Sequence, residues 1–175
     1  MQPLNPHGSS TLSDQEKANR TRTMQIIVFA LLLGLLTFVG ISIGIAAQDQ
    51  PMTAEVEDFY FIMSVAFAVM SVMARIVVGA AAVKTQAPAL RGQSREMQEN
   101  QLWMVYQTTL IVRSALLEGP AFYATVMYMS SGNVLTLAVA GVLAFLLLLS
   151  IPTRLRIDNW VEDKLTQLEL SGNRF

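Results

Sequence analysis

Four long runs of apolar residues, separated by short polar segments, dominate the chain. They cover residues 24–47, 59–83, 102–129 and 134–151, and a helix needs roughly 20 apolar residues to cross the hydrocarbon core of a bilayer. The last run is at the short end of the tolerated range. A soluble fold would require helices that are apolar on every side. The pattern therefore predicts an all-α integral membrane protein, a four-transmembrane-helix bundle.

The polar leader before the first run divides into two parts. Residues 1–12 are rich in Pro, Ser, Asn and Gly, and we expect a disordered tail there. Ser13 and Glu16 match a capping box, which predicts a helix that starts near Asp14 and continues into the membrane. The first run is longer than the about 7–15 apolar residues of a cleaved signal peptide, so an uncleaved signal-anchor helix is favoured over a signal peptide.

The apolar runs place a transmembrane domain at residues 13–151, and the chain becomes polar after Pro152. Residues 152–175 are expected to form a cytoplasmic amphipathic helix and tail, with Trp160 on the apolar side. A helix of this kind directly after a span favours a position in the membrane surface. Docking on a cytoplasmic partner is the alternative.

Basic residues outside the spans all lie on one side of the predicted bundle, whereas the loop between the first two spans carries only acidic charges. The positive-inside rule then places both termini in the cytoplasm, and we expect a bacterial inner (plasma) membrane. The basic residues are Lys17, Arg20 and Arg22 before the first span, Lys84, Arg91 and Arg95 between the second and third, and Arg154, Arg156, Lys164 and Arg174 after the fourth.

Composition argues against several functional classes. The chain has no cysteine, which excludes disulfide and thiol chemistry, and its single histidine, His7, lies in the leader. No basic tract supports nucleic-acid binding. The spans offer no Ser-His, Asp-Asp or metal-ligand constellation, so we expect no enzyme activity, no cofactor and no metal site.

Glu118 is the residue with the clearest functional meaning. It is a carboxylate near the middle of the third run, where burial costs roughly 2.5–3.5 kcal/mol. Such residues face a bundle interior or a water-filled cavity and mark functional sites. Gly119 and Pro120 follow, and Pro120 cannot donate a hydrogen bond to the carbonyl of Leu116. The sequence predicts a kink and a small polar pocket there; the alternative is a kinked helix whose acid pairs with an arginine.

Polar and small residues recur at helical spacing in the second and third runs. Small residues on one face are typical of helix–helix interfaces in membranes, so these faces are expected to meet protein and not lipid. The faces consist of Ser64, Ala68, Ser71, Arg75, Gly79 and Ala82 in the second run, and of Gln107, Ile111, Ser114, Glu118 and Thr125 in the third.

Two arginines accompany the acid within the spans, Arg75 and Arg113. Arg113 precedes Glu118 by five residues, which places it some 140° around the same helix, so these two do not form a simple pair. Arg75 is the better charge partner for Glu118. The remaining cation then predicts a homo-oligomer, a membrane partner protein or a bound anionic lipid that satisfies Arg113.

Residues 105–122 resemble the acid-bearing helix of the rotor-ring c subunits of F-type ATP synthases, through a Thr-rich stretch at 107–111 and an Ala-Leu-Leu-Glu string that ends at Glu118. The resemblance implies that Glu118 carries a proton or a sodium ion. It also implies a hairpin whose basic loop, with Arg91, is cytoplasmic. The second run lacks the dense glycine repeat of that family, and two further spans flank the hairpin.

Two functions compete on this basis. The chain is short for a self-contained transporter and shows no inverted repeat, so we expect a structural, assembly or accessory subunit of a membrane complex. The alternative is a proton- or ion-linked membrane component that uses Glu118 as the protonatable group. Carbodiimide reactivity of Glu118 separates the two.

Overall fold

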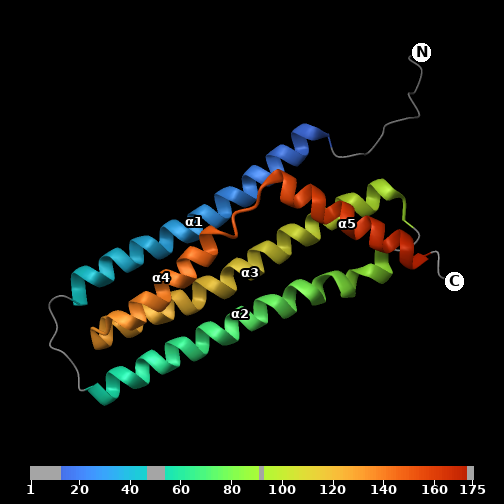
Figure 1. The fold of residues 1–175 in the computed structure, drawn as a ribbon. Coiled ribbons are helices and arrows are strands. Elements are labelled where there is room, and N and C mark those ends of the chain that lie inside the picture. The colour runs from blue at the N-terminus through green and yellow to red at the C-terminus, as the bar shows by residue number, and fades with distance from the viewer. Residues whose placement is uncertain (1–12, 47–53, 91–92, 173–175) are drawn as a thin grey trace, which may run out of the picture.

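The computed structural model describes residues 13–46, 54–90 and 93–172, and these residues form five helices and no strand (Figure 1). Three of the helices, α1, α2 and α3, are long and apolar enough to cross a membrane, and α4 is a shorter apolar helix. The expected disordered tail at residues 1–12 lies outside the described residues. In chain order the helices are α1 (Asp14–Ala46), α2 (Ala54–Leu90), α3 (Arg95–Ser131), α4 (Val134–Leu148) and α5 (Arg154–Gly172).

Side-chain caps define several helix ends. The predicted capping box is confirmed, since the backbone N–H of Ser13 donates to Glu16 Oε2 (3.0 Å) and that of Glu16 donates to Ser13 Oγ (3.2 Å). Gly132, at φ 70°, ends α3, and its N–H donates to the carbonyl of Tyr128. Asn133 then caps α4 through Oδ1, which accepts from the N–H of Leu135 (2.8 Å). Two residues thus connect α3 to α4.

Helix α4 is shorter than the sequence pattern predicts. It ends at Leu148, whereas the apolar run continues to Ile151. The cause is Pro152, which disfavours the helical conformation of the residue before it and cannot donate a backbone hydrogen bond. The 15 residues of α4 span about 22 Å, compared with about 30 Å for a hydrocarbon core.

Helix α3 is the centre of the molecule and packs against all four other helices. It lies between α1 and α2 (Figure 1), while α4 contacts both of these flanking helices. The core therefore follows α3 and is closed by residues of α1, α4 and α5. Its fully buried members include Met24, Val28 and Leu35 of α1, Leu102, Trp103 and Leu117 of α3, Leu147 of α4 and Ile157 of α5.

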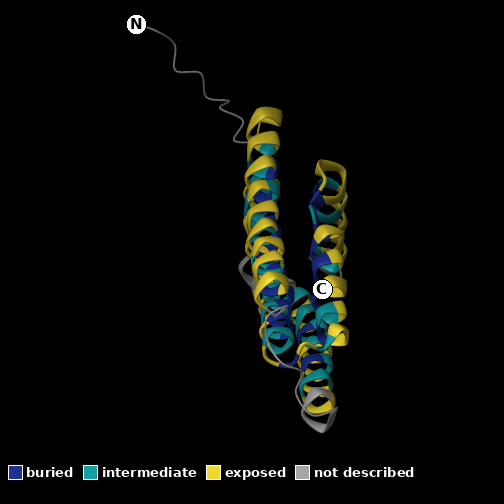
Figure 2. Cartoon of the chain, turned by 90° about the vertical axis from the view of Figure 1, so that its left-hand side faces the viewer, coloured by how far each residue is buried: buried dark blue, intermediate teal, exposed yellow. Residues whose placement is uncertain are grey.

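The outward faces of the long helices are apolar. Figure 2 shows exposed residues along their outer sides and buried residues between them. On α2 the side chains of Ile62, Met70 and Val77 are 62%, 69% and 63% exposed. Soluble monomers rarely expose contiguous apolar surface of this extent, so these faces fit contact with lipid.

The predicted small-residue face of α2 meets protein. Ser64 and Ser71 are buried, and Arg75 and Gly79 are partly buried, while Ile76 and other residues on the opposite side are exposed. The serine hydroxyls are satisfied within the helix, as Ser64 Oγ donates to the carbonyl of Tyr60 (2.8 Å). Close packing against α3 follows, because small side chains let two backbones approach.

Helix α5 does not present its apolar face to the membrane surface, contrary to the sequence-based expectation. Ile157, Val161 and Leu165 are 0%, 4% and 5% exposed and belong to the common core. The face is covered by α1 and α3, both of which contact α5. The apolar spacing predicted the amphipathic helix correctly, but it could not show that the chain itself supplies the covering surface.

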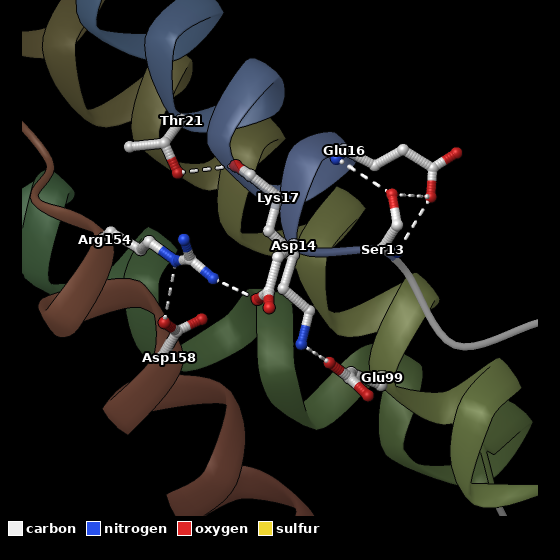
Figure 3. A network of polar contacts seen from close by, with 8 residues as sticks. All are labelled: Ser13, Asp14, Glu16, Lys17, Thr21, Glu99, Arg154 and Asp158. Carbon is white, nitrogen blue, oxygen red and sulfur yellow. Dashed lines mark hydrogen bonds and ion pairs between the residues drawn. The ribbon is translucent and has the colours of Figure 1, made fainter.

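A polar network holds this end of the molecule together (Figure 3). Arg154 of α5 binds both Asp14 of α1 and Asp158. Lys17 of α1 forms an ion pair with Glu99 of α3 at 2.5 Å. Arg154 thus joins α5 to the polar extension of α1, and Lys17 joins that extension to α3. The two extensions form the surface on which α5 packs.

Candidate functional site

Three arginines line a cavity of about 400 Å³ at the end of the bundle where α2, α3, α4 and α5 meet. We call it the arginine cavity. Each arginine comes from a different helix, so only the folded chain brings them together. The lining residues are Arg75 and Gly79 of α2, Tyr106, Thr109, Leu110 and Arg113 of α3, Leu146 of α4, Leu149 and Ser150 after it, and Arg156 and Trp160 of α5.

Arg75 is held at the turn that follows α4. Its Nη2 donates to Ser150 Oγ at 2.7 Å, and this hydroxyl donates in turn to the carbonyl of Leu146 at 2.6 Å. The Nε of Arg75 is buried and has no hydrogen-bond partner. The guanidinium is therefore positioned by one neutral hydroxyl and keeps unused donors.

Arg113 packs over a glycine of the neighbouring helix. A Cβ atom placed on Gly79 would lie 3.4 Å from both Cζ and Nη1 of Arg113, in van der Waals contact with the guanidinium. Like Arg75, Arg113 has a buried Nε without a hydrogen-bond partner. The glycine in the small-residue face of α2 therefore makes room for this cation.

Helix α5 supplies the third arginine and an aromatic wall. Arg156 is exposed, and its Nη1 donates a long hydrogen bond, 3.4 Å, to the carbonyl of Leu149. Trp160, one turn later on the same face, meets Tyr106 of α3 edge to face, with ring centroids 5.2 Å apart. The docking of α5 thus completes the cavity.

The electrostatics of the cavity are one-sided. No carboxylate is among its lining residues, and Arg75 experiences Coulombic interactions with both Arg113 and Arg156. Like charges gathered around one cavity repel one another. A group with negative charge in the cavity would remove this repulsion and satisfy the free N–H groups.

Glu118 lies on a different side of α3. Asn100 and Phe122 of α3, which contact Arg20 and Phe38 of α1, are separated from Glu118 by 18 and four residues, so all three share a helix face. This face is directed toward α1. Glu118 lies at the edge of this packed face, because Ser114, one turn before it, is buried whereas Ala115 and Gly119 are exposed.

Within the described residues, Glu118 has neither an ion pair nor a hydrogen bond to a side chain. The structure does not join it to Arg75, because Arg75 lies on the Arg113 side of α3. Helix α1 offers no cation at this level either, since residues 24–46 carry no charge. The predicted pair of Arg75 and Glu118 is therefore replaced by a cluster of Arg75 with Arg113.

The remaining predicted polar residues of α3 have different environments. Ser114 and Thr125 are buried, whereas Gln107 is partly exposed. Thr125 Oγ1 donates to the carbonyl of Ala121 (2.8 Å), and Ser114 Oγ is buried without a partner. Helix α3 stays continuous through Pro120, and the arginine cavity does not include Glu118.

Sequence reasoning missed the contribution of α5 to the site. The sequence pattern identifies Arg156 only as a topology marker and Trp160 only as part of a membrane-surface helix, and it places Ser150 within a span. One pattern could have indicated more: Arg156 and Trp160 are four residues apart, directly after the turn at Pro152. They therefore share a face that returns toward the bundle.

Over the described residues, no group of three or more His, Cys, Asp or Glu side chains gathers in a metal-binding arrangement. Comparison of the chain with protein-family models, with curated proteins and with solved structures gave no match. Two charged places in the described part of the chain, the arginine cavity and the surroundings of Glu118, are therefore the candidate functional sites.

Proposed function

We propose that this chain is a structural, assembly or accessory subunit of a membrane complex, and that it binds another membrane chain at the α1-facing side of α3 around Glu118. It would cross the membrane four times with both termini in the cytoplasm. The supporting observation for this topology is that the basic residues outside the spans lie on one side.

Two features favour α4 as the fourth span. The two-residue connection at Gly132 and Asn133 reverses the chain, so α4 runs back along α3. The helix itself spans about 22 Å, and the apolar sequence continues for three further residues to Ile151. The apolar segment is thus longer than the helix alone and comes closer to the hydrocarbon thickness of about 30 Å.

The observation that carries the proposal is the lack of a partner for Glu118 within the chain. An intramembrane carboxylate is costly unless a cation, a hydrogen-bond donor or water satisfies it. Glu118 lies at the edge of the packed face, where a second chain can reach it. A cation or donor of a neighbouring subunit at this position would stabilise the complex and fix its register.

A second candidate function follows from the same residue. An unpaired carboxylate at membrane depth is also what a proton- or ion-linked component requires, and residues 105–122 resemble the acid-bearing helix of rotor-ring c subunits. In that case Glu118 would exchange a proton with water, and a partner subunit would not cover it permanently.

The substitution Glu118→Gln tests the first function against the second. We expect insertion to survive, because a neutral side chain costs less in the membrane. The mass of the complex in gently solubilised native membranes should fall to that of the single chain. The matched control is Glu162→Gln, which removes an exposed carboxylate of α5 and should leave the mass unchanged.

Carbodiimide labelling completes the experiment. A subunit contact should protect Glu118 in the complex, whereas an ion-linked component should react readily at neutral pH. If wild type and Glu118→Gln are both single chains in native membranes, the subunit proposal is wrong. Reaction of Glu118 in the intact membrane would then support the ion-linked alternative.

A further inference from the structure

An apolar groove adjoins the arginine cavity. It lies between α2 and α4, has a volume of about 490 Å³ and is lined by apolar side chains alone. Leu146 of α4 lines both the groove and the arginine cavity, so the two adjoin at this side chain. The lining residues of this α2–α4 groove are Phe61, Val65, Ala68, Val69, Val72 and Met73 of α2, and Leu135, Ala138, Val139, Val142, Leu143 and Leu146 of α4.

The groove has the dimensions of one leaflet. From Phe61 to Met73 the helix rises about 18 Å, compared with about 15 Å for half of a hydrocarbon core. Arg75 lies two residues after Met73 on α2, and Ser150 lies four residues after Leu146, just beyond the end of α4. An apolar channel of leaflet length thus ends at a cluster of positive charge.

The arginine cavity has the chemistry of a phosphate site. Guanidinium groups bind phosphate through charge-assisted and often bidentate hydrogen bonds. Arg75 and Arg113 each keep a buried N–H without a partner, and no carboxylate among the lining residues competes for these groups. Tyr106 and Trp160 form an aromatic wall, which is typical of the headgroup level of a bilayer.

We propose that the chain binds one anionic phospholipid, with the phosphate in the arginine cavity and an acyl chain in the α2–α4 groove. The phosphate offsets the repulsion among Arg75, Arg113 and Arg156. Because Arg156 belongs to α5, the bound lipid also joins the membrane helices to the cytoplasmic helix. A free phosphate would use the same cavity, but it would leave the adjoining apolar groove without an occupant.

This proposal rests on the membrane location of the chain and is independent of the role of Glu118. The test uses the full-length protein in mild detergent, titrated separately with phosphatidylglycerol, phosphatidylcholine and inorganic phosphate. Native mass spectrometry measures the one-to-one adduct. We expect phosphatidylglycerol to bind wild type about tenfold or more tightly than it binds Arg156→Gln, since a charged hydrogen bond is lost.

Arg95→Gln is the matched control for charge, because Arg95 is exposed on the same end of the molecule and pairs only loosely with Glu169, at 3.8 Å. This variant should bind phosphatidylglycerol as wild type does. For the groove, Ala138→Phe fills the space with a ring and should weaken lipid binding. Leu148→Phe adds a ring on the same helix outside the groove and should not.

Equal retention of phosphatidylglycerol by wild type and Arg156→Gln would overturn the proposal. So would binding of inorganic phosphate to wild type without binding of phosphatidylglycerol, which would identify a site for a soluble anion. Phosphatidylcholine bound as tightly as phosphatidylglycerol would show that the net charge of the lipid is irrelevant. Unchanged lipid binding by Ala138→Phe would exclude the acyl chain from the groove.

Discussion

The two sides of α3 handle buried charge in different ways. On the side of α2, α4 and α5, three arginines gather around a cavity, where Arg75 donates to the hydroxyl of Ser150 and Arg156 to the carbonyl of Leu149. On the side of α1, the single carboxylate Glu118 lies beside the uncharged part of that helix, residues 24–46, and has no partner among the described residues. Opposite charges are thus present in one bundle but are kept apart by the width of a helix.

This difference shows that the presence of both signs of charge within the spans does not by itself pair them. Arg113 and Glu118 are five residues apart, and the resulting rotation of about 140° directs them to different neighbours. Each side is therefore left with its own excess charge. A bound anion would neutralise the arginine side. A hydrogen-bond donor or a cation from another molecule would satisfy the carboxylate on the Glu118 side.

The largest effect on this comparison should come from detaching α5. Ile157→Ala removes a fully buried side chain from the face of α5 that packs on α1 and α3, and we expect a loss of about 2–5 kcal/mol in the free energy of unfolding. Leu155→Ala, at a side chain that is 75% exposed, should change it by less than about 0.5 kcal/mol.

The measurements are the midpoint of thermal unfolding in detergent and the rate of proteolysis after α4. Carbodiimide labelling of Glu118 should be the same in Ile157→Ala as in wild type, because α5 belongs to the arginine side. A change in that labelling would show that the two sides of α3 are coupled and do not hold their charges independently.

An intermediate effect is expected from Gly79→Leu. A Cβ atom at this position already contacts the guanidinium of Arg113 at 3.4 Å, so we expect the larger leucine side chain to displace it. Overpacking of this kind costs about 1–3 kcal/mol. The control is Gly141→Leu on α4, where nothing lies within 4 Å of the added Cβ.

Thermal unfolding of the two glycine variants in the same detergent gives the comparison directly. Gly79→Leu should also lose phosphatidylglycerol binding, and Gly141→Leu should keep it. If Gly79→Leu unfolds at the wild-type temperature, Arg113 is not fixed against α2 in the way that the structure places it.

The smallest effect is predicted for a double-mutant cycle of Arg75→Gln and Glu118→Gln. The two residues lie on opposite sides of α3, so their effects on the free energy of unfolding should add within about 0.5 kcal/mol. A cycle of Arg75→Gln and Arg113→Gln should show coupling, because removal of either cation relieves the other. Strong coupling of Arg75 with Glu118 would restore the ion pair that the sequence suggested.

Much of the architecture could be read from the sequence because it depends on local patterns. The apolar runs predicted three long helices, and the Ser13–Glu16 pattern predicted the start of α1. The small residues around Ser71 predicted the packed face of α2. The end of α4 was placed three residues too late, at Ile151 instead of Leu148. The backbone restriction imposed by Pro152 outweighed the hydropathy of the last turn.

The sequence by itself determined the helical class, the apolar exterior and the presence of isolated charges within the spans, because helix formation and hydropathy act over a few turns of chain. Only the tertiary structure decided which charges meet. Arg75, Arg113 and Arg156 are brought together by the packing of α2, α3 and α5, and the apolar face of α5 is covered by α1 and α3. Such contacts depend on the rotation and the register of each helix against its neighbours, which side chains far apart in the sequence establish jointly.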